Sequence, residues 1–429
     1  MVFYKESDFA ETSIGDFPKD WKIVALGDVA RVKGGKRVPK GEKLVDFKTG
    51  FPYVRIVDFK NSTVDVSGLK YLLPETHEKI KNYTISSDDV YISIAGTIGL
   101  AGLIPPELHG ANLTENAAKL CDLREVRKEF LAYLLNSESL REQITGLVGK
   151  GTQPKLALFR IESLKLPLPS SSEQGKISEL LGVVDSVIGL VDEVIAKTER
   201  LKKGLMQELL TKGIGHKEYK DTPIGKTPKE WEVVQLDGLI LDVKNGFASG
   251  KRDEEGIVQI RMNNVSIDGR LLLDTYLKVP IPENIDVWLL KTNDFLFNNT
   301  NSIDLVGKSA IFKSAPFPCT FSNHFTRMRF REDRVLPEMI LYHFIAHWEK
   351  GYFKSVAIRH VGQAAVHTQY LLRLKIPLPP LSEQKKIVDV LSTVDNKLAL
   401  ERKEKMRLQR IKRGLMDLLL TGKVRVKVD

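Results

Sequence analysis

Cysteine is scarce in this chain of 429 residues, which has only Cys121 and Cys319, one in each half. Two cysteines this far apart match no zinc motif and build no disulfide framework, so we expect a reducing, cytoplasmic environment. Long apolar runs are also missing, because no stretch approaches the ~18 residues that a membrane-spanning helix needs. The first residues contain no apolar segment of the kind found in signal peptides, and we expect none. These absences argue against disulfide-stapled and membrane-spanning folds.

Proline is absent from two long stretches, each of which follows a proline-rich lead. Residues 166–211 read LPLPSSSEQGKISELLGVVDSVIGLVDEVIAKTERLKKGLMQELLT, and residues 376–421 read IPLPPLSEQKKIVDVLSTVDNKLALERKEKMRLQRIKRGLMDLLLT. Proline cannot continue a helix, whereas the ~40 residues after each lead contain none, so each stretch predicts a helix of roughly 60 Å. We expect Ser172 and Ser382 to be the N-caps, because a serine hydroxyl can accept a hydrogen bond from the first turn.

The apolar residues of these stretches recur at alternate spacings of four and three, the pattern of a coiled-coil seam. The expected seam residues of the first stretch are Ile177, Leu181, Val184, Ile188, Val191 and Ile195. In the second stretch they are Ile387, Leu391, Val394 and Leu398, then, after an interruption by Glu401 and Lys405, Leu408, Ile411, Leu415 and Leu419. A narrow apolar stripe on a long helix needs a partner, so we expect the two helices to pair antiparallel, with one globular region at each end. The alternative is two unrelated amphipathic helices, each packed on its own domain.

The second stretch repeats the first at a constant offset of 210 residues, and the sequence PKDW at 18–21 recurs at the same offset as PKEW at 228–231. The repeat therefore covers the whole chain. Between these landmarks lie short β-type segments joined by Gly, Asn and Ser turns, followed by helical patterns. We expect a mixed α/β (α+β) fold with a pseudo-twofold internal repeat. The expected parts are a globular region at 1–165, a lead and long helix at 166–213, a second globular region at 214–375, and a lead, long helix and C-terminal tail at 376–429.

The two globular regions diverge strongly, but four short echoes of one in the other survive with small shifts of register. The paired segments are VKGG at 32–35 and VKNG at 243–246, VRI at 54–56 and IRM at 260–262, DDVYIS at 88–93 and NDFLFN at 293–298, and ANLTENAAKL at 111–120 and CTFSNHFTRM at 319–328. The pattern indicates one frame built twice, with two different faces mounted on it. Such an arrangement suits a protein that reads two different things.

A net charge of +10 points to a polyanionic partner, although many proteins are mildly basic. Basic residues cluster in the long stretches at 197–203 and 403–413. These clusters are expected to form the outer face of a coiled coil. The alternative is contact with DNA phosphates or with an acidic patch on a partner.

The doubled lead-plus-helix pattern, LPLP…SEQ…GLMQELLT with IPLPPLSEQ…GLMDLLLT, and the PKDW and PKEW motifs resemble the specificity subunit of type I restriction–modification systems. The resemblance covers essentially the full chain. It implies that 1–165 and 214–375 are target-recognition domains, each reading one half of a split DNA site. It also implies that the two helices form an antiparallel spacer that docks methyltransferase subunits.

The resemblance further implies which partners and cofactors the complex uses. Two methyltransferase copies would bring S-adenosylmethionine, and a restriction subunit that uses ATP would join through them. The chain itself is then a non-catalytic, cytoplasmic DNA-binding subunit and is expected to bind neither cofactor. Two alternatives stay open: a coiled-coil scaffold whose globular ends bind proteins, and a DNA-modifying enzyme that acts unaided.

The Gly- and Asn-rich turns carry the residue types that bind DNA. Lys and Arg neutralise phosphates, Arg can bond two atoms of guanine at once, and Asn or Gln can do the same with adenine. Gln153 and Gln363 occupy equivalent positions and are the preferred base readers, although any single residue of this kind can equally be a solvated loop residue. The predicted DNA-binding residues are Lys33, Lys36, Arg37, Arg55, Thr97, Thr152, Gln153, Lys155, Lys244, Asn245, Lys251, Arg252, Arg261, Asn263, Asn299, Asn301, Arg359 and Gln363.

Catalytic and metal-binding motifs are not found. The sequence Gly307-Lys308-Ser309 is reminiscent of a nucleotide-binding loop, but Ser302 replaces the first glycine of that motif. His343 and His347 have the helical spacing of zinc ligands, yet no glutamate follows His343. No loop resembles the Asn-Pro-Pro-Tyr segment that an adenine methyltransferase needs. We predict no catalytic residue, no metal site and no cofactor site.

Overall fold

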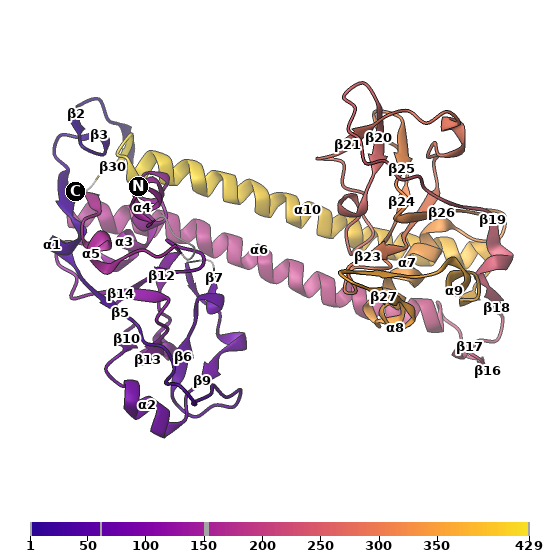
Figure 1. Cartoon of the computed structure of the whole chain (residues 1–429), viewed down its shortest axis with the longest axis horizontal. Helices are drawn as coiled ribbons and strands as arrows, with labels where there is room; N and C mark the ends of the chain where they lie inside the picture. Colours follow the sequence, from indigo (N-terminus) through magenta and orange to yellow (C-terminus); the bar gives the residue numbers. More distant parts are fainter. Residues whose placement is uncertain (1, 61, 150–153, 428–429) are drawn as a thin grey trace. The chain divides into compact units, whose positions relative to one another are not determined.

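The computed structural model describes residues 2–60, 62–149 and 154–427. The chain forms two compact units: unit 1 contains 1–192 and 403–429, and unit 2 contains 193–402. Each unit holds one globular region, the N-terminal part of one long helix and the C-terminal part of the other (Figure 1). None of the helices within the described ranges is both long enough and apolar enough to span a bilayer.

Unit 1 begins and ends in one two-stranded sheet, in which β1 pairs with β30, and its globular region contains two four-stranded sheets ordered β12-β11-β14-β5 and β10-β13-β6-β9. Its elements are β1 (Phe3–Lys5), β2 (Phe9–Thr12), β3 (Gly15–Pro18), β4 (Lys22–Ala25), α1 (Leu26–Val29), β5 (Arg31–Gly34), β6 (Pro52–Val54), β7 (Phe59–Lys60), β8 (Thr63–Val64), β9 (Lys70–Tyr71), α2 (Pro74–Ile80), β10 (Thr84–Ile85), β11 (Val90–Ser93), β12 (Ala101–Leu103), β13 (Ala111–Leu113), β14 (Ala117–Cys121), α3 (Lys128–Leu135), α4 (Glu138–Leu147), α5 (Leu158–Glu162), β15 (Lys165–Leu168) and β30 (Val424–Val426).

Unit 2 contains a four-stranded sheet ordered β19-β26-β22-β24 and two three-stranded sheets ordered β21-β20-β25 and β23-β28-β27. Its elements are β16 (Tyr219–Thr222), β17 (Gly225–Pro228), β18 (Glu232–Gln235), β19 (Ile240–Asn245), β20 (Ile257–Ile260), β21 (Leu277–Val279), β22 (Asp294–Asn298), β23 (Thr300–Asn301), β24 (Ser309–Phe312), β25 (Cys319–Phe321), β26 (Phe325–Phe330), α7 (Pro337–Glu349), α8 (Tyr352–Val356), β27 (Ile358–His360), β28 (Gln363–Ala365), α9 (Thr368–Leu372) and β29 (Lys375–Leu378). The mixed α/β prediction is confirmed.

The two predicted long helices are present as α6 (Ser171–Lys212) and α10 (Leu381–Leu420). Their predicted N-caps are wrong. The N–H of Glu173 donates to the hydroxyl of Ser170 at 3.3 Å, while the N–H of Glu383 donates to the carbonyl of Pro380 at 2.9 Å. Each helix begins one residue before the motif serine, so that Ser172 and Ser382 lie inside the first turn and not at the cap.

The helix parts within each unit pair antiparallel, as predicted. In unit 1, Lys412 Nζ lies 2.6 Å from Asp185 Oδ1 and Lys405 Nζ lies 2.5 Å from Asp192 Oδ1. One partner's number falls as the other's rises, which is the register of an antiparallel pair. Unit 2 repeats the arrangement, with Lys202 Nζ 2.6 Å from Asp395 Oδ1.

The buried seam differs from the predicted one in the second helix. Ile177, Leu181, Leu391 and Leu398 are buried as expected. Ile411, however, is 42% exposed, so its assignment to the seam is wrong. The inward position at this level belongs to Lys412, which reaches Asp185 on the partner helix. A search for apolar residues alone cannot find a seam position that is filled by an ion pair.

The glutamine of the Ser-Glu-Gln motif fastens each long helix to its globular region. In unit 1 the side chain of Gln174 accepts from the N–H of Arg127 at 2.8 Å and donates to the carbonyl of Glu125 at 2.9 Å. In unit 2, Gln384 accepts from the N–H of Leu336 at 2.9 Å and donates to the carbonyl of Arg334 at 2.9 Å. A single amide that donates and accepts in this way satisfies backbone groups that burial would otherwise leave unpaired.

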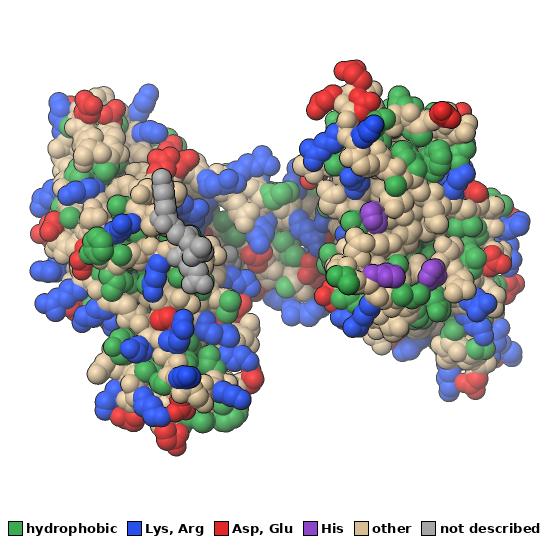
Figure 2. Space-filling model, viewed as in Figure 1, with side chains coloured by type: hydrophobic (Ala, Val, Ile, Leu, Met, Phe, Trp, Pro, Cys, Tyr) green, Lys and Arg blue, Asp and Glu red, His purple; other side chains and the backbone are tan. Residues whose placement is uncertain are grey.

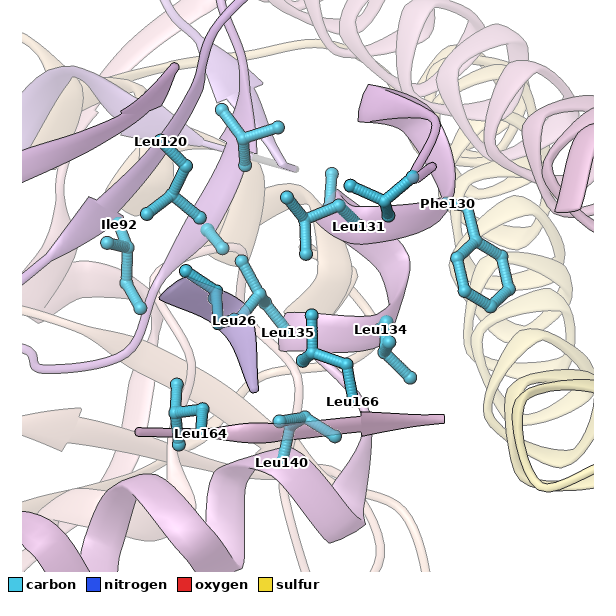
Figure 3. Packing of buried hydrophobic residues seen from close by; sticks show 14 of the residues in the cluster. Leu26, Ile92, Leu120, Phe130, Leu131, Leu134, Leu135, Leu140, Leu164 and Leu166 are labelled. Atoms are coloured by element: carbon cyan, nitrogen blue, oxygen red, sulfur yellow. The ribbon is translucent and has the colours of Figure 1, made fainter. Parts of the chain in front are cut away.

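The largest core cluster of unit 1 contains residues of the β12-β11-β14-β5 sheet, of α3 and α4, and of both long helices. Leu26, Ile92, Leu120 and Leu135 point into one cluster (Figure 3) that also includes Leu419 of α10. Unit 2 has a corresponding core rich in phenylalanine. Leu168 of β15 and Leu378 of β29 show that the proline-rich leads are strands whose apolar side chains complete these cores.

Candidate nucleic-acid interface

In unit 2, the ends of β19 and β22 and the start of β26 meet at one side of the sheet, which we call the edge of unit 2. Asn245 is paired with Thr326, and Asn298 with Phe325. Side chains tie the edge together: Thr326 Oγ1 donates to Asn245 Oδ1 at 2.8 Å, and Asn299 Nδ2 donates to Thr326 Oγ1 at 3.1 Å. The loops that leave these strand ends are therefore held close to one another.

The hairpin of β27 and β28 joins this edge through β23. Thr300 pairs with Ala365, and the N–H of Val366 donates to the carbonyl of Asn299 at 2.9 Å. Arg359 and Gln363 lie on this hairpin and are exposed. The edge of unit 2 thus brings together predicted residues from three loops that are far apart in the sequence.

Unit 1 builds the same edge from its own strands. The N–H of Gly35, after β5, donates to the carbonyl of Ala117 at 3.0 Å, and the N–H of Ile94, after β11, donates to the carbonyl of Asn116 at 2.8 Å. Ala95 forms a β-bridge with Lys155. Lys155 and Ala365 are equivalent in the repeat, so the returning segment closes the edge at the same place in both units.

The glycine in each VKGG and VKNG echo is required by close backbone packing. A Cβ on Gly35 would lie 2.1 Å from the carbonyl oxygen of Thr114, and one on Gly246 would lie 2.2 Å from that of Ser322. Real side chains do not tolerate such distances, so only glycine fits. The echo therefore marks construction of the edge and is not itself evidence of DNA contact.

The arginine of each VRI and IRM echo has a different electrostatic environment in the two units. Arg55 Nη2 lies 2.7 Å from Asp58 Oδ1 and its Nε lies 3.0 Å from Oδ2 of the same carboxylate. The residue equivalent to Asp58 is Asn264, which accepts from the N–H of Arg261 at 2.9 Å but carries no charge. Arg261 donates from Nη2 to the carbonyl of Ser249 at 2.9 Å, and no described carboxylate forms an ion pair with it. The charge of Arg55 is neutralised within the fold, whereas that of Arg261 is not.

The charged loops near the edge of unit 1 also include an ion pair that the sequence did not reveal. Arg37 Nε donates to Glu115 Oε1 at 2.6 Å, and this hydrogen bond to the carboxylate raises the pKa of Arg37. Lys36 lies over the ring of Tyr83, with Nζ 5.3 Å from its centroid. In unit 2 the position of Glu115 is taken by the uncharged Asn323. The edge of unit 2 is therefore less acidic at this position.

Aromatic and histidine side chains at the edge of unit 2 were not singled out in the sequence. Lys244 Nζ lies 5.6 Å from the ring centroid of Trp288, and Trp288 Nε1 donates to the carbonyl of Asn245 at 3.3 Å. Burial and the charge of Arg261 lower the pKa of His324. Lys244 and Trp288 are separated by more than forty positions in the sequence, as are Arg261 and His324, so no local sequence signal identifies these pairs.

The predicted DNA-binding residues differ in how accessible they are. Arg55, Lys244, Arg261 and Asn299 are half-buried, and Asn301 is buried. Thr152 and Gln153 lie outside the described residues, so the preferred base reader of unit 1 has no structural account. The exposed members are Lys33, Lys36, Arg37, Thr97, Lys155, Asn245, Lys251, Arg252, Asn263, Arg359 and Gln363. Figure 2 shows Lys and Arg side chains distributed over the visible face of each unit, interspersed with Asp and Glu.

Two of the predicted asparagines already have protein partners. Asn301 Nδ2 donates to Asn298 Oδ1 at 2.6 Å, and its Oδ1 accepts from the N–H of Ser302 at 2.8 Å. Asn299 donates to Thr326 and accepts from Thr300 Oγ1 at 2.9 Å. These side chains hold the edge in shape, and their contact with DNA stays a prediction.

Lys308 of the sequence reminiscent of a nucleotide-binding loop has a structural role. Its buried Nζ donates to the carbonyls of Met262 at 2.9 Å and Val265 at 2.6 Å, and burial lowers its pKa. It thereby fixes the short 3₁₀ helix at Met262–Asn264, which follows Arg261. Across residues 2–60, 62–149 and 154–427, no cluster of His, Cys, Asp and Glu has the arrangement of a metal site.

Comparison with known proteins agrees with this doubled architecture. The family model described as "Type I restriction modification DNA specificity domain" matches residues 18–200 and 228–410. The chain is 30% identical over 438 residues to the type I restriction enzyme MjaVIII specificity subunit of Methanocaldococcus jannaschii, covering 100% of this chain and 98% of that protein. It is 23% identical over 386 residues to the StySPI specificity subunit of Salmonella potsdam, covering 87% and 82% of the two chains.

Solved structures show a similar fold. The type I restriction–modification S subunit of M. genitalium matches with a TM-score of 0.54 and 14% identity, covering 95% of this chain and 97% of that one. A chain from a structure concerned with complex assembly and conformational transition of the type I R-M system matches with a TM-score of 0.56 and 19% identity, covering 95% and 99%. With both halves matched by one family model and the full length matched by a relative, this chain belongs to the family of type I restriction–modification DNA specificity proteins.

Proposed function

We propose that this protein is the sequence-specific DNA-binding subunit of a type I restriction–modification complex, and that each unit reads one half of a split target. The observation that supports this most directly is the pair of equivalent edges. The same strand ends, close-packed glycine and returning segment recur in both units, while the side chains around them differ. A common frame with different faces is what recognition of two unlike half-sites requires.

The contact with DNA would combine two kinds of side chain. Exposed lysines and arginines such as Lys33, Lys155 and Arg252 would neutralise phosphates, which gives affinity but no sequence information. Exposed amides such as Gln363 would bond base edges in the major groove. Because α6 and α10 each continue from one unit into the other, we propose that they act as the spacer between the two readers.

The long helices also offer a surface for partner subunits. Val183, Val187 and Leu190 of α6 are exposed at helical spacings of four and three, so they form an apolar stripe outside the seam. The family relationship makes a methyltransferase subunit the natural occupant, and we propose that two copies bind. The restriction subunit would join through them, in the cytoplasm.

We further propose that catalysis resides in these partners. The methyltransferase would supply S-adenosylmethionine and the restriction subunit would use ATP. The role of this chain's own residues would be to bind and orient DNA. If the isolated chain methylated or cleaved DNA without partner subunits, this assignment would be contradicted.

The test is a binding selection with the full-length chain and a pool of random-sequence duplex DNA. We expect a split motif of two short half-sites and an affinity that falls steeply as salt rises. Mapping of methylated bases in a host that carries the whole complex should return the same split motif. A chain that binds proteins but shows neither selection nor salt-dependent DNA binding would instead be a scaffold.

A further inference from the structure

The β27–β28 hairpin of unit 2 carries an apolar residue at its tip. His360 pairs with Gln363 as the last pair of the ladder, and the two residues between them, Val361 and Gly362, form the turn. Val361 is fully exposed, so it contributes no contact to the core of unit 2. Single exposed apolar residues are common on protein surfaces, so the meaning of Val361 depends on what surrounds it.

The turn chemistry gives no reason for a valine at this position. The backbone of Gly362 has a φ of +76°, whereas the φ of Val361 is negative. This combination corresponds to a type II turn and not to the primed turns that hairpins favour. Polar residues such as Asn or Asp, or proline, normally supply turn stability here. Valine at the tip is therefore explained neither by packing nor by local propensity.

The base of the hairpin is firmly anchored, so its tip is a fixed projection. Ala364 and Val366 are buried, and β28 pairs with both β27 and β23. Asn301 of β23 is itself held in place, because its Nδ2 donates to Asn298 Oδ1 at 2.6 Å. A side chain at this tip can be presented to a partner with little loss of conformational freedom.

The residues around Val361 have the chemistry of a nucleic-acid contact. Arg359, His360 and Gln363 are exposed, and the segment 357–366 contains no acidic residue. Asp304, whose pKa is lowered by Lys354 and more weakly by Arg359, is paired with Lys354 Nζ at 2.6 Å. The tip thus combines an apolar centre with basic and amide flanks.

We infer that the β27–β28 hairpin enters the major groove of the half-site bound by unit 2, and that Val361 packs against the C5-methyl group of a thymine. A two-stranded ribbon fits the major groove, and the thymine methyl is the apolar group that base pairs present there. Gln363, next to the turn, would reach the adjacent base pair. This inference rests on the proposed function and adds the element and the base chemistry.

The experiment compares two duplex pools of random sequence, one with dT and one with dU in its place, bound by full-length chain. Deoxyuridine pairs like thymidine but lacks only the methyl group. With the wild-type chain, we expect one A·T position of one half-site to lose selection in the dU pool. A duplex of the selected sequence should also bind about fourfold more weakly when deoxyuridine replaces that thymidine, because this is the factor expected for losing one buried methyl-sized group.

The variant Val361→Ser, which a turn accommodates, should bind the thymine and uracil duplexes equally. Val66→Ala, at an exposed valine of unit 1, is the control and should keep the full methyl effect. An unchanged melting temperature of Val361→Ser would show that folding is intact. A wild-type chain that selects a split motif while Val361→Ser retains the methyl effect would overturn this contact alone, whereas a wild-type chain that selects no motif would contradict the proposed function.

Discussion

The two units hold the first-turn glutamate of their long helices with different partners. In unit 1, Arg425 Nη2 lies 2.7 Å from Glu173 Oε2, and Asp20 and Glu6 surround the same guanidinium. In unit 2 the equivalent Glu383 accepts from Trp231 Nε1 at 2.9 Å and contacts His216 Nε2 at 2.9 Å. The repeat preserves the carboxylate but not the group that satisfies it.

This difference changes the role of the tryptophan that both units share. Trp231 donates its indole N–H to Glu383, whereas Trp21 Nε1 is buried without a partner among the described residues. The ring of Trp21 instead faces Arg425, with Cζ 5.8 Å from its centroid. A duplicated frame can thus keep its residues while their interactions diverge, because only the sum of contacts at each junction has to be favourable.

The largest expected effect comes from substituting Arg425, the cation that pairs with Glu173 in unit 1. Arg425→Ala would leave Glu173, whose side chain is 1% exposed, without its charge partner. A buried charge left in this way costs about 3–5 kcal/mol, so hydrogen exchange should report a loss of this size in the free energy of unfolding of unit 1. His216→Ala should cost unit 2 only about 1 kcal/mol, because Glu383 keeps its bonds from Trp231 and from the N–H of Ile214.

The control for both variants is Arg413→Ala, at an exposed position of α10. It should leave both units unchanged within about 0.5 kcal/mol. Equal destabilisation of the two units by Arg425→Ala and His216→Ala would mean that Glu173 and Glu383 depend equally on these two partners.

The sequence predicted the parts of the fold that repeat. Proline-free length, seam spacing and ungapped recurrence were enough for the two helices and their antiparallel pairing, because these features depend on local periodicity. The short echoes pointed to the two edges, since a position such as Gly246 leaves no space for a side chain. Two more detailed predictions failed. The serine caps depended on where each helix begins to within one residue, and the place of Ile411 in the seam depended on which side of the helix is buried.

The candidate site was less predictable, because its properties depend on contacts between distant segments. Glu115 beside Arg37 and Trp288 beside Lys244 have no local signal. One contact was readable, however. The residue three positions after the echoed arginine is acidic in unit 1 and an amide in unit 2, and this decides whether Arg55 or Arg261 keeps a free charge.

That contrast gives the second prediction. Arg55→Gln should cost unit 1 about 2 kcal/mol of stability, because Asp58 loses its charged partner, but should not change the salt dependence of DNA binding. Arg261→Gln should change stability less and should lower the slope of log K against log salt by about one, as expected for one lost phosphate contact. Titrations at several salt concentrations, together with denaturation curves, separate the two outcomes.

The matched control for this pair is Arg270→Gln in unit 2. Arg270 Nε lies 3.1 Å from Asp268 Oδ2, so a carboxylate of the fold pairs with this guanidinium as Asp58 pairs with Arg55, and the same carboxylate also pairs with Arg402. Its substitution should leave the salt slope intact. A slope that falls equally for Arg55→Gln and Arg261→Gln would show that the carboxylate of Asp58 does not keep Arg55 from DNA.

The smallest expected effect tests what the two units have in common. Tyr133 donates to Asp185 at 2.9 Å and Tyr342 donates to Asp395 at 2.9 Å, which ties each globular region to its helix pair. Burial and the neighbouring carboxylate raise the pKa of both tyrosines, so their hydroxyls stay protonated and donate at neutral pH. Each Tyr→Phe variant should therefore cost about 1 kcal/mol, and the two losses should be equal.

Protection of α3 in unit 1 and of α7 in unit 2 against hydrogen exchange measures the two losses separately. Tyr83→Phe and Tyr370→Phe, at exposed tyrosines of the same units, are the controls and should have no effect. Unequal losses would mean that even this repeated contact has diverged in strength. Equal losses would place the tyrosine–aspartate contact in the part of the frame that both units still share. Glu173 and Glu383 differ in this respect, because the same repeat has given these two equivalent carboxylates different partners.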